Sequence, residues 1–127
     1  MNVRLLRRGF LLGAAPLLLE GADEEVFAGI PAVRFDLDGN NSIRVDLSDQ
    51  GAEKYKCRVV MRKKRYYWAN REDRELNRVD AGDFTYFLSP EGTGMIKIAL
   101  KPGGTYDYME LLTTELKTVT YWGKRSR

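Results

Sequence analysis

The sequence predicts a mainly β (β-rich α+β) domain, a small antiparallel barrel or sandwich of about seven strands with one short C-terminal helix. Apolar and charged residues alternate strictly in several short segments, which is the period of half-buried strands. Clusters of turn-forming residues separate these segments, as expected for hairpins. Near the C-terminus the apolar spacing changes to that of a helix.

The first hairpin is expected over residues 33–47. Residues 33–37 and 43–47 alternate between apolar and charged side chains, and the intervening residues 38–42 are rich in turn formers. The expected register places the apolar residues on one face and opposite charges across from each other. It pairs Val33 with Leu47, Arg34 with Asp46 and Asp36 with Arg44.

A second hairpin with a basic tip is expected next. Tyr55, Cys57, Val59 and Met61 alternate with the basic residues Lys56, Arg58 and Arg62. Residues 62–65 are all basic, and residues 66–69 again have high β propensity. Residues 70–83 are dense in charge and contain few large apolar side chains. This segment therefore predicts a loop that includes a short strand at most.

The C-terminal third predicts a third hairpin, a helix and a last strand. Residues 84–88 and 95–100 flank a turn sequence rich in Gly, Pro and Ser. A helix is expected over 108–117, because Asp107 followed by Glu110 fits a capping box. Its apolar residues at helical spacing are Met109, Leu112, Leu116 and Val119. Residues 119–122 are expected to form the last strand.

The N-terminal residues have the layout of an export signal. Arginines and no acid precede an uncharged, Leu- and Ala-rich run at residues 9–19. This run is shorter than the roughly 20 residues that a membrane-spanning helix needs. Arg7, Arg8, Phe10 and Leu11 belong to an Arg-Arg-x-Phe-Leu sequence, which resembles the core of a bacterial twin-arginine signal.

This resemblance implies export of a folded protein, in some cases together with a partner, to the periplasm or the outer face of the inner membrane. We expect residues 1–28 to be the signal, with 26–28 as the best cleavage sequence, and residues 29–127 to be one β-rich domain. Two alternatives remain open. One is a Sec-type signal with two arginines, and the other is an amphipathic or core helix over residues 3–19 of a cytoplasmic protein.

The composition argues against several kinds of chemistry. Histidine is absent and Cys57 is the only cysteine, which removes the usual general base, the common zinc ligands and any intrachain disulfide. The sequence contains no recognised motif for a catalytic nucleophile or a nucleotide, and the acidic residues of 72–83 are interleaved with arginines. We therefore expect a protein that is not an enzyme and has no cofactor or metal.

The main candidate for a binding site is a basic cluster in residues 54–65, which contain seven basic and no acidic side chains. The cluster consists of Lys54, Lys56, Arg58, Arg62, Lys63, Lys64 and Arg65. Such a surface attracts polyanions, and nearby aromatic rings can stack on bases or sugars. The candidate stacking residues are Tyr66, Trp68 and Trp122. The alternative is a solvated face whose charges discourage strand pairing between molecules.

These observations favour a non-enzymatic, exported protein of the cell envelope. It would be an accessory or structural subunit of a larger complex, or a docking module that uses the basic hairpin. The expected partners are an envelope protein and an anionic membrane surface or polysaccharide. One alternative is a periplasmic module that binds an anionic polymer or glycan. Another is a cytoplasmic nucleic-acid-binding β barrel, which requires that residues 1–28 are not a signal.

Overall fold

A computed structural model describes residues 22–99 and 106–126 of this chain, and the signal residues Arg7, Arg8, Phe10 and Leu11 lie outside them. The described residues form nine strands and one short helix. The elements are β1 (Glu24–Asp38), β2 (Asn41–Asp46), α2 (Asp49–Lys54), β3 (Cys57–Arg62), β4 (Arg65–Trp68), β5 (Arg74–Ala81), β6 (Phe84–Leu88), β7 (Gly94–Ala99), β8 (Tyr108–Thr114) and β9 (Lys117–Arg125).

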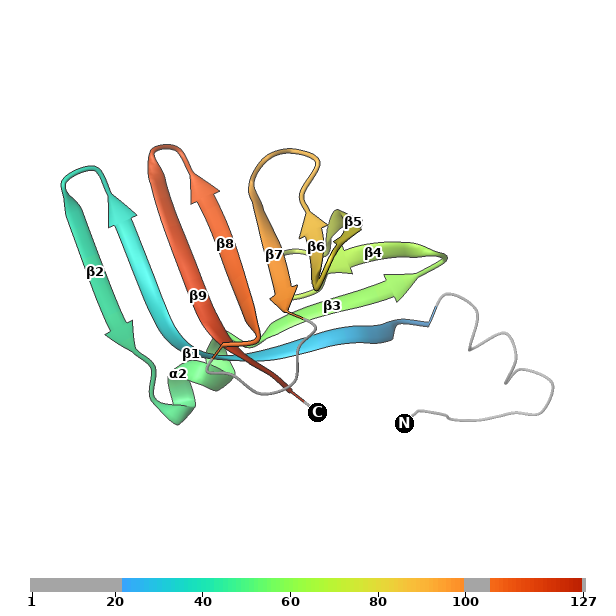
Figure 1. Ribbon diagram of the computed structural model, residues 1–127, viewed down its shortest axis with the longest axis horizontal. Helices are drawn as coiled ribbons and strands as arrows, with labels where there is room; N and C mark the ends of the chain where they lie inside the picture. The colour runs from blue at the N-terminus through green and yellow to red at the C-terminus, as the bar shows by residue number, and fades with distance from the viewer. Residues whose placement is uncertain (1–21, 100–105, 127) are drawn as a thin grey trace.

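The strands form an antiparallel barrel with one additional strand (Figure 1). Each of β3 to β8 pairs with the strand that follows it, and pairing of β1 with both β3 and β9 closes the barrel. Strand β2 pairs only with β1 and extends the sheet beyond the closed part. The prediction of a mainly β fold with a small antiparallel barrel is therefore confirmed, with more strands than expected.

Strand β1 holds the barrel together because it has three partners. Its first residues pair with β3, its last residues pair with β2, and its opposite edge pairs with β9. The register shifts between Glu25 and Phe27 and again between Pro31 and Val33. Such bulges bend a strand and increase its twist, so one 15-residue strand can leave the barrel wall and continue into the open sheet.

Aromatic and branched aliphatic side chains fill the barrel. Phe27 and Tyr108 meet edge to face with their ring centroids 5.2 Å apart. The buried cluster consists of Phe27, Cys57, Val59, Trp68, Leu76, Phe87, Ile96, Ile98 and Tyr108. Because Phe27 belongs to it, the folded domain begins at Glu24 rather than at residue 29. A cut after Ala28 would remove a core side chain and the first pairs of β1 with β3.

The first hairpin forms, but its register is one residue away from the prediction. Asp38 pairs with Asn41, so only Gly39 and Asn40 remain in the turn, and Gly39 has a φ of 56°. A two-residue turn of this kind matches the twist of the strands. Every residue of β2 is exposed, so no buried face opposed the shift.

This register also changes the predicted charge pairs. Arg34 donates to Asp36 of its own strand at 2.7 Å, and Arg44 pairs with Asp46 of its own strand at 3.0 Å. Across the two strands, Arg34 faces Val45. The charges therefore pair along the strands rather than across them.

The predicted C-terminal helix is wrong. Residues 108–117 instead form β8 and the start of β9, joined by a turn in which Glu115 has a φ of 51°. Leu116, which the helical spacing placed on an apolar face, lies in this turn and is 90% exposed. Pairing of β8 with both β7 and β9 provides its backbone hydrogen bonds, so long-range pairing overrides the local helical pattern.

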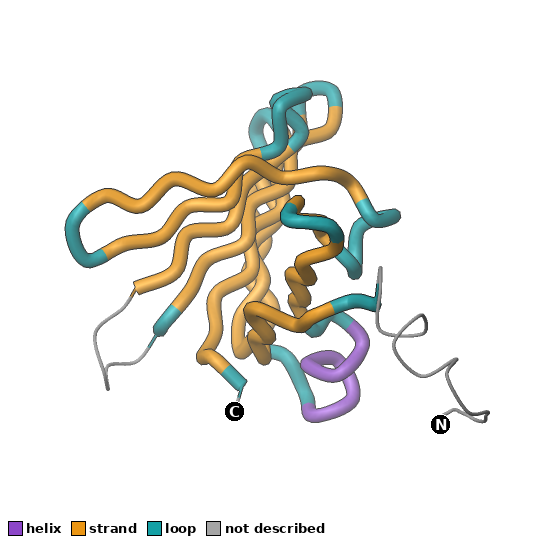
Figure 2. Tube along the Cα trace, turned by 90° about the vertical axis from the view of Figure 1, so that its right-hand side faces the viewer, coloured by secondary structure: helices purple, strands orange, loops and turns teal. Residues whose placement is uncertain are grey.

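Two elements were not predicted. Helix α2 begins after Ser48, whose hydroxyl accepts a hydrogen bond from the Gly51 amide at 3.1 Å, a typical N-cap. Figure 2 shows this helix, the only one in the described ranges, at one end of the strands. Strand β5 is eight residues long and lies where a loop with a short strand at most was expected. Among its eight residues only Leu76 is buried, so the sequence there shows almost no alternation of apolar and polar residues.

The pairing of β1 with β9 requires a residue without a side chain at position 123. A Cβ atom at this position would collide with the backbone of Ile30 and Pro31. We expect Gly123→Ala to lower the free energy of unfolding by about 1–3 kcal/mol, as overpacking does in other proteins. Urea unfolding measures this. Gly51→Ala is the control, because position 51 lies in helix α2 and has room for a Cβ atom. This substitution should be neutral or stabilising. Equal losses of stability at both positions would contradict the prediction.

Candidate functional site

The predicted basic hairpin exists, and its tip is a two-residue turn. Arg62 pairs with Arg65 at the ends of β3 and β4, which leaves Lys63 and Lys64 in the turn with φ values of 54° and 67°. Both lysines are exposed. Such turns match the twist of a hairpin, so β3 and β4 hold the two ammonium groups at a fixed end of the molecule.

The three arginines of the basic cluster are paired with acids. Arg58 Nε lies 2.9 Å from Glu25, and Arg62 Nε lies 2.6 Å from Asp23. Arg65 lies 3.8 Å from Glu75. The hydrogen bond from Arg62 lowers the pKa of Asp23, which keeps that carboxylate charged.

The four lysines of the cluster fall into two separate pairs. Lys63 and Lys64 lie at the hairpin tip, whereas Lys54 and Lys56 lie beside the other end of β3. Six residues of strand separate the two pairs, which corresponds to roughly 20 Å. Within the described residues none of the four forms an ion pair. The structure therefore divides the predicted single surface into two small ones.

The structure corrects one of the candidate stacking residues. Trp68 is 0% exposed, so its ring cannot stack on a base or sugar. Tyr66 is half-buried and packs on Phe87 with centroids 5.3 Å apart. Trp122 is half-buried and meets Phe35 edge to face at 5.0 Å. Trp122 is also partly exposed and lines a surface cavity.

This cavity is shallow, has a volume of about 170 Å³ and lies far in sequence from the basic cluster. Trp122 lines it with Tyr106, whose ring centroid is 6.0 Å away, and with Phe84. The Lys97 ammonium lies 4.3 Å from the centroid of the Phe84 ring. Partly exposed aromatic rings can stack on flat ligand faces, so this cavity is a candidate surface for a glycan.

A buried polar cluster that the sequence analysis missed lies inside the barrel. Glu110 is 0% exposed and accepts hydrogen bonds from Trp68 Nε1 at 2.6 Å and Asn70 Nδ2 at 3.1 Å. Arg71 lies 3.4 Å from the same carboxylate. A buried charge is tolerated only when it is paired and hydrogen-bonded, and these three donors satisfy Glu110. The capping-box interpretation of Glu110 concealed this role.

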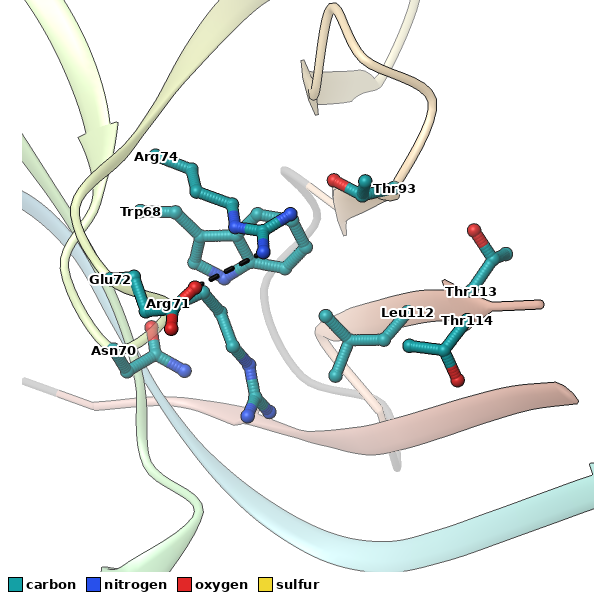
Figure 3. Close-up of a pocket in the computed structure, with 9 residues that line it drawn as sticks. All are labelled: Trp68, Asn70, Arg71, Glu72, Arg74, Thr93, Leu112, Thr113 and Thr114. Atoms are coloured by element: carbon teal, nitrogen blue, oxygen red, sulfur yellow. Dashed lines mark hydrogen bonds and ion pairs between the residues drawn. The ribbon is translucent and has the colours of Figure 1, made fainter.

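Trp68, Asn70 and Arg71 of this cluster line a cavity of about 300 Å³ (Figure 3). Asn70 and Arg71 reach from this cavity to Glu110. Arg74 on the rim lies 3.1 Å from Glu72 and 4.0 Å from Glu91. The remaining lining residues are Thr93, Leu112, Thr113 and Thr114. Because both arginines that line it already have acidic partners, the cavity offers little attraction to an anion.

The acidic residues considered for catalysis lie mainly in surface ion pairs. Besides Glu72 and Glu75, Asp80 pairs with Arg78 at 3.2 Å, and Asp73 lies 3.9 Å from Arg62. Their side chains are 46–80% exposed. This arrangement is that of solvated surface charges, and it does not bring two carboxylates together in a cavity.

The buried cluster predicts a specific pH dependence of stability. Burial and the neighbouring Glu110 carboxylate raise the pKa of Cys57 well above its usual value. In the unfolded chain a cysteine ionises near pH ~8.5. Above this pH the unfolded state releases a proton that the folded state keeps, so the free energy of unfolding falls as pH rises. The slope from this one group is at most about 1.4 kcal/mol per pH unit.

Urea unfolding between pH 7.5 and 9.5 measures this effect. The range ends below the pH at which tyrosines in an unfolded chain ionise, roughly 10. We expect the natural chain to lose stability over this range and Cys57→Ala to lose less, whatever its absolute stability. Identical slopes for the two chains would contradict the predicted shift of Cys57.

Comparisons with protein families, with curated proteins and with solved structures found no match to this chain. Residues 22–99 and 106–126 contain no group of three or more Cys, Asp or Glu side chains placed to hold a metal ion. In the same residues no helix is long and apolar enough to span a membrane. What the protein does is therefore inferred from its own residues.

Proposed function

We propose that this chain is an exported, non-enzymatic domain of the cell envelope that docks on an anionic membrane surface through Lys63 and Lys64. It would act there as an accessory subunit of a larger complex. The observation that carries the proposal is the Arg62–Asp23 ion pair, at 2.6 Å. This pair places the beginning of the folded domain directly beside the lysine tip, at one end of the molecule (Figure 1).

The length of the chain limits how far the tip can be from the apolar run. Residues 9–19 form that run, and only three residues lie between Leu19 and Asp23, so four Cα-to-Cα steps separate them. A fully extended chain spans at most about 3.6 Å per residue, or roughly 14 Å here. Wherever a membrane takes up residues 9–19, the lysine tip therefore lies close to the same membrane surface.

The charges on this end suit an anionic surface. A basic residue near an anionic membrane contributes about 1 kcal/mol, and the effect falls off within a Debye length. Lys63 and Lys64 contribute fully because no acid in the described chain pairs with them, whereas Asp23 and Asp73 neutralise Arg62. Two lysines alone bind weakly, and an apolar segment nearby provides the second of the two signals that stable attachment requires.

One observation supports the alternative of a periplasmic module that binds a glycan. The cavity lined by Phe84, Tyr106 and Trp122 is the kind of aromatic surface that a periplasmic glycan-binding module would use. The nucleic-acid alternative loses support, because Trp68 is buried and the arginines of the basic cluster are paired with acids. Membrane docking is favoured, since it uses the lysines that remain unpaired and explains their position beside Asp23, where the described part of the chain begins.

The docking proposal predicts that the two lysine pairs behave differently. We expect Lys63→Ser with Lys64→Ser to weaken binding of the full chain to phosphatidylglycerol-containing vesicles by about 30-fold, because two contacts of about 1 kcal/mol are lost. Co-sedimentation at increasing salt concentrations measures the affinity, and the salt dependence should decrease in the variant.

The matched control is Lys54→Ser with Lys56→Ser, which removes the same charge from the other end of β3. This variant should bind like the natural chain. Equal loss in both variants would mean that only net charge matters, and unchanged binding in the tip variant would refute docking through the tip. Neutral phosphatidylcholine vesicles measure the contribution of the apolar run alone.

A further inference from the structure

Strand β2 is the one strand in the described residues that has a partner on a single side. Figure 1 shows it at the end of the sheet, beyond the closed barrel. All six of its residues are exposed, and Ile43 and Val45 are 55% and 41% exposed. An exposed strand edge presents unpaired backbone groups to any strand that can match it, so what it can pair with depends on its own side chains.

The backbone of β2 determines which residues can pair outward. The Leu47 amide donates to Ala32 of β1 at 2.9 Å. Backbone groups alternate between the two edges of a strand in an antiparallel ladder. Val45 and Ile43 therefore point their amides and carbonyls toward β1, whereas Arg44 and Asp46 point theirs toward the open edge.

We propose that two copies of this chain associate through β2, edge to edge and antiparallel, about a two-fold axis at Val45. In this register Arg44 of each copy faces Asp46 of the other copy, with their outward backbone groups hydrogen-bonded. Val45 faces Val45 of the second copy on the opposite face. Opposite charges directly across a pair of strands stabilise it, and here the symmetry forms two such pairs at once.

Neighbouring registers are excluded by the same residues. A shift by two residues in one direction places Arg44 opposite Arg44 of the second copy. The opposite shift places Asp46 opposite Asp46. Both set like charges directly across from each other, which is destabilising. A shift by one residue would set outward backbone groups against inward ones, so no ladder would form.

The interactions that β2 already makes do not compete strongly with this pairing. Arg44 and Asp46 of one chain are 3.0 Å apart, but their side chains are 57% and 78% exposed. Such exposed pairs contribute little, and each carboxylate has a second oxygen for the arginine of the other copy. Ile43 and Val45, which are exposed in the single chain, gain apolar neighbours from the second copy.

Sedimentation equilibrium of the full chain over a range of concentrations tests the proposal. The natural chain should form dimers, and Arg44→Asp alone or Asp46→Arg alone should weaken dimerisation at least tenfold, because each creates two like-charge pairs. An equimolar mixture of these two variants should recover the dimer, since every facing pair is again of opposite charge. The double variant Arg44→Asp with Asp46→Arg should recover it too.

Oxidative cross-linking tests the register separately. Val45→Cys should form an intermolecular disulfide because the two positions face each other, whereas Ile43→Cys, on the same face, faces residue 47 of the second copy and should not. The native Cys57 is 0% exposed and does not interfere. A chain that is monomeric at every concentration, a mixture that stays monomeric, or equal cross-linking at both positions would each overturn the proposal.

Discussion

The structure depends on one constraint, which is that β1 must pair with strands of the barrel and with β2 of the open sheet at the same time. It pairs with β3 through its first residues and with β9 along most of its length, and this closes the barrel. Two glycines allow the close packing around β1. A Cβ atom at Gly29 would collide with the ring of Tyr108, and one at Gly123 would collide with the backbone of Ile30. Because β9 occupies one edge of β1 and β3 only part of the other, β2 is left at the margin of the sheet.

Closure also explains the buried polar cluster. Side chains alternate between the two faces of a strand, so closing the barrel forces every second residue of β8 inside, including Glu110 between Tyr108 and Leu112. The carboxylate is tolerated there because Trp68 and Asn70 donate to it and Arg71 lies beside it. The cluster thus fixes the short connection that follows β4, and its charges are used for structure rather than left for a ligand.

The sequence predicted the elements whose pattern is local and missed those that depend on distant partners. The hairpin at Lys63 and Lys64 was predicted because apolar alternation and turn chemistry agree there. The register at Gly39 was not, because β2 has no buried face to select it. The helix expected around Leu112 failed because β7 and β9 compete for the same backbone groups. The basic cluster was found by composition, but Asp23 and Glu25, which neutralise part of it, had been assigned to the signal.

The two proposed surfaces lie at opposite ends of β1, and this makes them independent. The lysine tip lies beside Glu24, which pairs with Met61, whereas β2 pairs with β1 from Val33 onward. Val33 lies nine positions after Glu24 in the strand, roughly 30 Å if extended, which is well beyond the range at which mutations usually couple. Membrane docking therefore does not occupy the edge of β2, and pairing of two copies does not cover Lys63 or Lys64. A molecule with both surfaces in use would present two lysine tips, and its attachment would strengthen by avidity rather than through any new contact, provided that the geometry lets both tips reach one surface.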